Sequence, residues 1–248
     1  SAGTRWRPRN PVAPVTRMSF LFDTRSSDSP FVETIWRTQG SGGGSFISTA
    51  VSNWEMVVTK QQGKITFSIR GPETKASTAP IPEDAEFLGI IFKQGSYMPH
   101  IPKRHLVNDA VHLVGTSGNS FWLQGGTWEF PNFENADTFV NRLISKEMLV
   151  QDHVVDDVLR GRTQDLSLRS VQRRFLYATG LTYKAIQQIE RARHALALLQ
   201  SGIPIPETAF QAGYFDQPHL TKSLKLFAGQ TPAEIAKSNQ NSVPQVPS

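Results

Sequence analysis

Side chains that can read DNA bases gather in the stretch 167–180, SLRSVQRRFLYATG. On a helix, Arg169, Gln172 and Arg173 would face outward together, because residues three and four apart are neighbours there. An arginine can donate two hydrogen bonds to guanine O6 and N7, and a glutamine can bind adenine N6 and N7. Neighbouring cations suit phosphate oxygens. The plainer alternative is a basic helix that is only solvated.

A second stretch, 217–227, combines a polar side with an apolar side. Leu220, Leu224 and Phe227 recur at helical spacing, which leaves donors, acceptors and positive charge on the other side. Those outward residues are Gln217, His219, Thr221, Lys222 and Lys225. A helix with such a face, held at an angle by a tight turn, suits the major groove of DNA.

The residues before this stretch predict a short helix that would position it. Pro204 and Pro206 admit a helix only at its start, and Ala209 and Phe210 supply its apolar positions. Gly213 ends it, because the chain just past a helix end needs a positive φ that other residues resist.

A tight turn over 214–216 then leads into the second helix. Asp216 or Gln217 opens that helix, and Pro218 falls in its first turn, where a missing N–H costs nothing. The pattern over 203–235 predicts a helix-turn-helix, with an ordinary helical hairpin as the alternative.

An earlier segment repeats this arrangement. A helix is expected over 153–161 and a turn over 162–166, after which Ser167 caps a second helix that ends at Gly180. A long helix over 182–202 joins the two units. The buried stripe expected for the capped helix is Leu168, Val171 and Phe175.

From about Gln151 onward the chain resembles the AraC/XylS family of bacterial transcription regulators. The first motif matches at Ser167, Val171, Arg173 and Phe175, and the connecting helix at Arg191 and Ala195. The second motif matches at Gly213, Tyr214, Phe215, Asp216-Gln217, Leu220, Phe227, Gly229 and Pro232. Departures from the family pattern are Tyr183, Ile186, Pro218 and Leu224, and Pro218 removes one polar contact from the second recognition helix.

The resemblance implies specific binding of double-stranded promoter DNA, with RNA polymerase as a partner. Two recognition helices held by the connecting helix would read successive major grooves about 34 Å apart. The residues expected to contact bases are Arg169, Gln172, Arg173, Gln217, Thr221 and Lys222. The residues expected to contact the DNA backbone are Ser170, Arg174, Arg191, Arg193, His219 and Lys225.

The stretch from 31 to about 130 is typical of a β domain. Short segments rich in Val, Ile, Phe, Trp and Thr alternate with Gly, Pro, Ser or Asn, which indicates a sandwich or small barrel. The segments 55–60 and 64–69 predict a hairpin around Gln61-Gln62-Gly63. The stretch also resembles, more distantly, the cupin-like barrels that serve as sensing domains in the same family, which implies effector binding or oligomer contact.

A barrel with a wide mouth can hold a small ligand. Six aromatic residues could line such a cavity, although aromatics in a β domain are more often plain core. They are Trp36, Trp54, Phe92, Tyr97, Trp122 and Trp128.

Between 134 and 150 the apolar period becomes helical. The apolar face holds Phe139, Val140, Leu143, Ile144 and Met148. Such a helix could pack on its own domain, pair with a second subunit in a homodimer, or simply connect the two domains.

Composition fits a globular protein of two domains: 248 residues, 38% hydrophobic and 19% charged. The net charge of +5 is only mildly basic, so the placement of charge matters more than its total. The chain has no cysteine, which excludes disulfides, thiolate zinc sites and cysteine nucleophiles. No apolar run is long enough to span a bilayer, so we expect no membrane partner and a cytoplasmic location.

These patterns together predict an α+β fold of two domains: a β-barrel or cupin-like domain, then an all-α domain with two helix-turn-helix motifs joined by a long helix. We expect a poorly ordered arm over 1–30 and a β-rich sensing or oligomerisation domain with a C-terminal linker helix over 31–148. The DNA-binding domain would span 149–240, followed by a disordered tail over 241–248.

A metal or cofactor is not expected. His100, His105 and His112 share no strand or helix face, and metal-binding cupins typically place two His one residue apart before a Glu. No nucleophile elbow or phosphate loop is present. The competing function is a cupin-type metal-dependent enzyme with an appended helical domain. In a third interpretation, the β half serves only for dimerisation.

Overall fold

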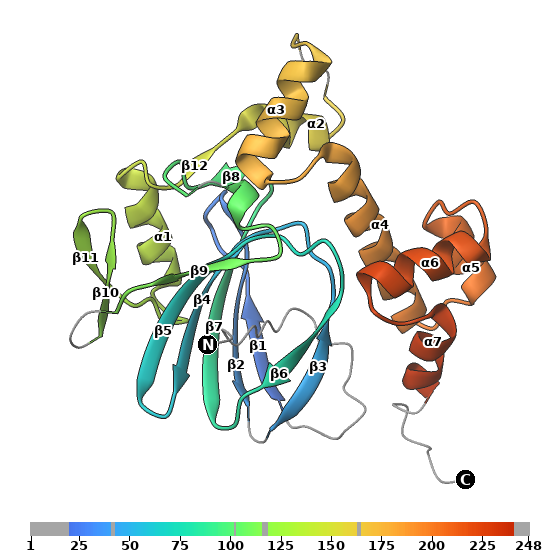
Figure 1. Ribbon diagram of the computed structural model, residues 1–248, viewed down its shortest axis with the longest axis horizontal. Coiled ribbons are helices and arrows are strands. Elements are labelled where there is room, and N and C mark those ends of the chain that lie inside the picture. Colours follow the sequence, from blue (N-terminus) through green and yellow to red (C-terminus); the bar gives the residue numbers. More distant parts are fainter. Residues whose placement is uncertain (1–19, 41–42, 102, 116–118, 163–164, 241–248) are drawn as a thin grey trace.

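The computed structural model describes residues 20–40, 43–101, 103–115, 119–162 and 165–240. A sheet-rich part is followed in the chain by a helical part, which confirms the predicted fold class. In Figure 1 the helix over 136–145 lies to the left of the sheet, whereas the later helices lie above the sheet and to its right. None of the described helices combines the length and the apolar character that crossing a membrane requires.

The main sheet has six antiparallel strands in the order β1-β2-β7-β4-β5-β9. They are β1 (Phe20–Arg25), β2 (Val32–Gly40), β4 (Glu55–Gln61), β5 (Lys64–Arg70), β7 (Ala85–Phe92) and β9 (Ala110–Leu113). Strands β1 and β9 are its edges, so in the described residues the sheet stays open instead of closing into the expected barrel. The predicted hairpin is confirmed: Gln61 pairs with Lys64 across a turn in which Gln62 and Gly63 both have positive φ.

Three smaller antiparallel pairs complete the β structure. They are β3 (Gly44–Ser48) with β6 (Ser77–Ile81), β8 (Ser96–Tyr97) with β12 (Val150–Gln151), and β10 (Ser120–Leu123) with β11 (Gly126–Glu129). The pairing of β12 with β8 carries main-chain hydrogen bonds across the predicted domain boundary near residue 149.

Each face of the main sheet has its own hydrophobic core. On one face, α1 (Ala136–Ser145) and the β10–β11 hairpin pack over residues such as Ile35, Met56 and Phe67. On the other face, Phe46 of β3 and Ala79 of β6 pack with residues of the main sheet. Of the three roles open to the helix in 134–150, the structure therefore shows packing on its own domain.

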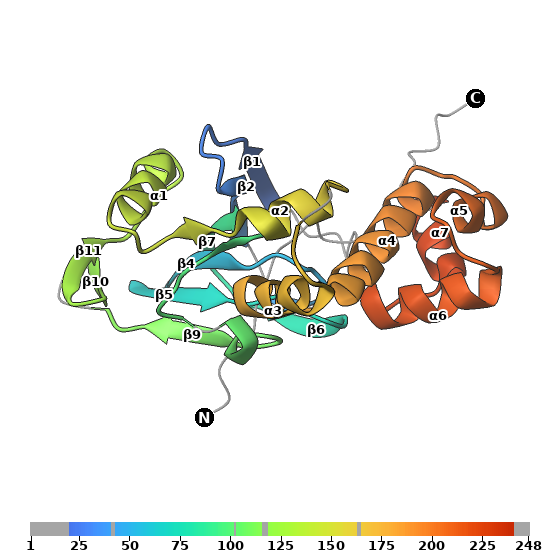
Figure 2. The same ribbon diagram turned by 90° about the horizontal axis from the view of Figure 1, so that it is seen from above.

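The helical part contains the two predicted helix-turn-helix motifs. Its helices are α2 (His153–Leu159), α3 (Leu168–Thr179), α4 (Tyr183–Gln200), α5 (Ile205–Gln211), α6 (Gln217–Phe227) and α7 (Pro232–Gln240). Helices α2 and α3 pack with the first half of α4, whereas α5, α6 and α7 pack with its second half. Helix α4 is thus the predicted connecting helix, and Figure 2 shows it between α3 and the group formed by α5, α6 and α7.

The predicted N-terminal arm is described only in part. Residues 1–19 and the predicted tail 241–248 lie outside the described residues. Residues 20–25 form β1, because each pairs with a residue of β2 from Ile35 to Gly40. The Arg25 guanidinium also donates two hydrogen bonds to the Phe133 carbonyl, at 2.9 and 2.7 Å.

Lys103 is a buried lysine beneath the first motif. It lies in the short 3-10 helix Lys103–His105, which packs against α3. Its ammonium nitrogen lies 3.4 Å from the centre of the Trp54 ring and has no hydrogen-bond acceptor among the described residues. Burial therefore lowers the pKa of Lys103 well below its usual range.

We predict that Gly89→Ala destabilises the β domain by about 1–3 kcal/mol, the usual cost of overpacking. Gly89 pairs with Trp36, and a Cβ at residue 89 would lie 2.0 Å from the Trp36 ring. Urea unfolding would measure the change. Gly115→Ala is the matched control, since the nearest atom to its Cβ is 4.0 Å away. Equal midpoints for the two variants would contradict the prediction.

Candidate nucleic-acid interface

The first candidate recognition helix, α3, begins and ends where its sequence signals lie. The Ser167 hydroxyl accepts the Ser170 N–H at 3.2 Å, and Gly180 ends the helix at φ 76°. Phe175 is fully buried. Leu168 was expected in the buried stripe, but its side chain is 74% exposed: it is the first residue of α3 and precedes Val171, which packs against the cluster that holds Phe175.

The three predicted base-contacting residues of α3 share its exposed side. Arg169, Gln172 and Arg173 are all exposed. Ser170, expected to contact the DNA backbone, is half-buried, and its hydroxyl lies 3.0 Å from that of Ser167. Helix α3 thus presents two guanidinium groups and one amide to solvent from a capped helix.

Arg174 has a partner within the protein. Its guanidinium lies 3.0 Å from the carboxylate of Asp152. Asp152 is buried and also accepts the N–H groups of Val154 and Val155, so it caps α2. Arg174 therefore holds α3 against the start of α2, and its expected contact with phosphate stays a prediction.

The second candidate recognition helix, α6, is fixed by the turn before it. The Asp216 carboxylate accepts the His219 N–H at 2.7 Å, and Pro218 lies in the first turn as predicted. Tyr214 is buried and its hydroxyl lies 2.7 Å from that of Ser223. Burial raises the pKa of Tyr214, and the Ser223 hydrogen bond and Arg191 oppose that rise.

The polar side of α6 is open to solvent. Gln217, Lys222 and Lys225 are exposed and Thr221 is half-buried. His219 is also exposed, with its ring edge-on to Tyr214 at 5.2 Å. Helix α6 therefore offers an amide, a hydroxyl and two ammonium groups along one side.

The two arginines of α4 have different surroundings. Arg191 lies over the Tyr214 ring at 5.7 Å and so borders the second motif. Arg193 pairs with Glu190 at 3.1 Å and lines a cavity between α4 and the β domain. The structure therefore places Arg193, predicted to contact the DNA backbone, on the side of α4 that faces the sheet. The sequence does not show on what α4 packs.

The C-terminal end of α6 is joined to the β domain. The Ala50 N–H donates to the Phe227 carbonyl at 2.7 Å, and the Ala76 N–H donates to the Leu226 carbonyl at 2.9 Å. Gly229, at φ 73°, follows this end; a Cβ there would lie 2.9 Å from Ile47. In Figure 1, α3 stands upright at the top while α6 runs across the right side, so the two helices are not parallel.

The six aromatic residues predicted to line an effector pocket do not share one cavity, although Trp54 and Phe92 stack with ring centroids 4.0 Å apart and Trp36 lines a cavity beside α4. Trp36 belongs to one core, and Trp54, Phe92 and Trp128 to the other. Tyr97 contacts Tyr177 of α3 at 5.2 Å, and Trp122 is 51% exposed. Strand alternation sends neighbouring side chains to opposite faces, so aromatic content alone does not define a pocket.

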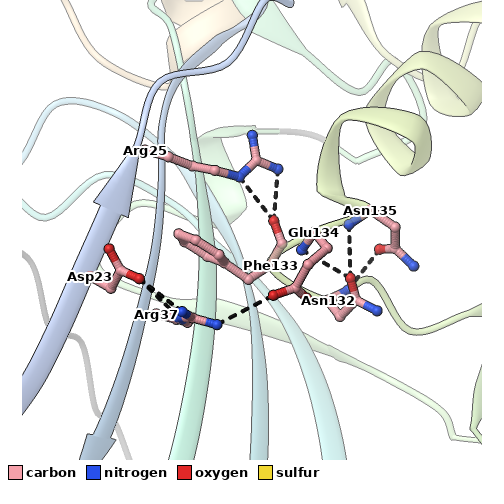
Figure 3. A network of polar contacts seen from close by, with 7 residues as sticks. All are labelled: Asp23, Arg25, Arg37, Asn132, Phe133, Glu134 and Asn135. Atoms are coloured by element: carbon pink, nitrogen blue, oxygen red, sulfur yellow. Dashed lines mark hydrogen bonds and ion pairs between the residues drawn. The ribbon is translucent and has the colours of Figure 1, made fainter.

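Two cavities open elsewhere on the β domain. The first, about 580 Å³, lies on the α1 face near the β4–β5 hairpin. Figure 3 shows its wall, where the Arg37 guanidinium lies 2.9 Å from the Asp23 carboxylate and 3.3 Å from the Glu134 carboxylate. The same guanidinium stacks on Phe133 at 4.4 Å.

The second cavity, also about 580 Å³, lies between the β domain and α4. Glu33, Thr34 and Asn53 line it on the β side. Glu190 and Arg193 line it on the α4 side. The described residues contain no group of three His, Cys, Asp or Glu side chains placed to hold a metal ion.

Comparison with known proteins identifies the helical part. Residues 162–238 match a family model described as a helix-turn-helix domain. No curated protein sequence matches the chain.

Three structures of ToxT from Vibrio cholerae are similar to the chain over most of its length. The P21 form has a TM-score of 0.38 and 10% identity, covering 88% of this chain and 98% of that one. The structure of ToxT from strain O395 has a TM-score of 0.39 and 10% identity, and the match covers 90% of this chain and 99% of that one. The structure of ToxT from strain SCE256 bound to an unsaturated fatty acid has a TM-score of 0.39 and 9% identity, and the match covers 94% of this chain and 100% of that one. At TM-scores this low, the likeness assigns no ligand to this chain.

We predict that Asp216→Ala destabilises the second motif by about 0.5–2 kcal/mol, because it removes the side-chain acceptor at the start of α6. Asp216→Asn keeps an acceptor and should retain most of the stability. Chemical unfolding of both variants beside the wild type would measure this difference. An alanine variant as stable as the asparagine variant would contradict the prediction.

Proposed function

We propose that this chain, which carries a C-terminal helix-turn-helix domain of the AraC type, is a transcription regulator that binds specific promoter DNA through both of its motifs. The observation that carries the proposal is the pair of capped helices, α3 and α6, whose exposed sides hold polar and cationic groups. The motifs share α4, which would set the spacing between two successive major grooves. RNA polymerase and a second copy of the chain stay predicted partners.

Roles in DNA binding follow from the surroundings of each side chain. Arg169, Gln172 and Arg173 on α3 would contact bases. Gln217, Thr221 and Lys222 on α6 would do the same. Ser170, Arg191, His219 and Lys225 would contact the backbone. Arg174 and Arg193 would contribute less, because each has an acidic partner within the protein.

Selection of bound sequences from a random DNA pool by the full chain, at two salt concentrations, tests this proposal. A bipartite motif with half-elements about one helical turn apart would support both recognition helices. Enrichment of one half-element alone would mean that α6 binds mainly phosphate groups. The absence of any enrichment, with weak binding that vanishes as salt rises, would overturn sequence-specific binding.

Arginine variants tested in the same selection give a sharper prediction. Arg173→Ala should cost about 1–3 kcal/mol in operator binding and relax one base preference, because it removes a base-reading side chain. Arg174→Ala should leave the sequence preference unchanged and instead lower stability, because it breaks the Asp152 ion pair. An unchanged preference in Arg173→Ala would count against its assigned role.

We also propose that a small molecule acts on the β domain through the cavity between that domain and α4. Its volume of about 580 Å³ suits a small ligand. A ligand there would contact both the sheet and the helix shared by the two motifs. The links between α6 and residues 50 and 76 offer a route from the sheet to the second motif.

Thermal shifts across a metabolite panel test this regulation. A ligand at 100 times its Kd should stabilise the wild type by about 2.7 kcal/mol. Ala197→Phe narrows the cavity and should abolish the shift, while Ala233→Phe on α7 should not. A shift retained in Ala197→Phe would place the ligand elsewhere. No shift with any metabolite would favour a β domain used only for dimerisation, and stoichiometric metal in the purified protein would favour the enzyme class.

A further inference from the structure

The most exposed large apolar side chain among the described residues belongs to Phe215, at 92%. It lies in the turn between α5 and α6, directly before Asp216, the N-cap of α6. Isolated apolar residues on a surface are common and need no explanation. The position of this one, at the start of the helix proposed to enter the major groove, is what gives it significance.

The backbone that carries Phe215 is held on both sides. Tyr214 is buried and hydrogen-bonded to Ser223, and Asp216 caps the helix. Gly213 takes the left-handed conformation that the end of α5 requires, at φ 70°. Because its neighbours are fixed, the Phe215 ring is presented outward by an ordered turn instead of a loose loop.

The start of α6 faces away from the rest of the protein. The other end of the helix is joined to the β domain through the Leu226 and Phe227 carbonyls. In Figure 1 the α5–α6 turn accordingly lies at the outer right, away from the sheet. Recognition helices contact base edges with their N-terminal residues, and Phe215 immediately precedes those residues in α6.

The phenyl ring limits which group on DNA Phe215 can contact favourably. A phenyl group cannot donate or accept a conventional hydrogen bond, and the apolar group on the major-groove edge of a base pair is the thymine C5-methyl. Lys222 and Lys225 on the same helix provide the positive charge that DNA phosphates attract. Nucleic acid is therefore the occupant that matches both the ring and its surroundings.

We propose that Phe215 is a specificity-determining residue that contacts thymine C5-methyl groups in the half-element bound by the second motif. This inference rests on the proposed DNA binding and extends it to a residue outside the recognition helix itself. Burial of one methyl against the ring corresponds to about fourfold in affinity.

Deoxyuridine substitution tests the contact directly, because it removes only the methyl group. Each thymine of the selected operator would be replaced in turn, and the Kd of the full chain measured by fluorescence anisotropy at constant salt. In the wild type, one or two positions within the α6 half-element should each lose about fourfold. In Phe215→Ala the same replacements should cost nothing further, whereas Phe215→Leu should retain part of the penalty.

Phe210→Ala is the matched control. Phe210 is also a solvent-facing phenylalanine, 85% exposed, but it lies on α5 instead of at the start of α6. The Phe210→Ala variant should keep the full loss of affinity on deoxyuridine replacement. The exposure of both rings means that neither truncation should disturb folding, which unfolding midpoints would check.

Three results would overturn the inference: no deoxyuridine penalty in the α6 half-element of the wild type, a full penalty retained in Phe215→Ala, or an equal loss of the penalty in Phe210→Ala. Each presupposes an operator with both half-elements, so each leaves the proposed DNA binding intact. Failure to select any operator would instead remove the proposed function and this inference together.

Discussion

The last turn of α6 obtains its hydrogen-bond donors from the β domain, and much of the architecture depends on this arrangement. The final carbonyls of a helix have no partner within the helix and need one elsewhere. Here the N–H groups of Ala50 and Ala76 supply partners for Phe227 and Leu226. Gly229 allows close approach, since any larger residue would collide with Ile47. The orientation of the second motif is therefore coupled to two loops of the β domain.

Helix α4 carries three contacts on three parts of its surface. Its first half packs with α2 and α3 through Ile186 and Ile189. Its second half packs with α5, α6 and α7 through residues such as Ala195 and Leu199. Glu190 and Arg193 lie on the side that faces the sheet. Each motif thus has its own hydrophobic cluster, while their separation is set by one continuous helix.

The sequence was sufficient to predict caps and turns, because their hydrogen-bond partners lie within a few residues of each other in the chain. Ser167 and Asp216 cap helices through N–H groups three residues on, and the turn at 61–64 is local in the same sense. Contacts between residues far apart in the chain could not be predicted from the sequence. Nothing in the helical stretch indicates that Arg174 binds Asp152 or that Arg193 faces the sheet. The second motif also shows that apolar character does not guarantee burial, since Phe210 is 85% exposed. Burial depends on which faces of other elements remain uncovered, and that is a property of the assembled fold.

The order of the sheet has a consequence for how the chain assembles as it is synthesised. Strand β2 is made early, but its neighbour β7 follows only at residues 85–92, with β3 to β6 between them in the chain. Non-local pairing of this kind is slow, but it can begin once residue 92 has been made, whereas α6 begins only at residue 217. Domains generally fold as units, starting from the N-terminus. We therefore expect the β domain to be complete before α6 leaves the ribosome, so that the last recognition helix finishes its final turn on a surface that already exists.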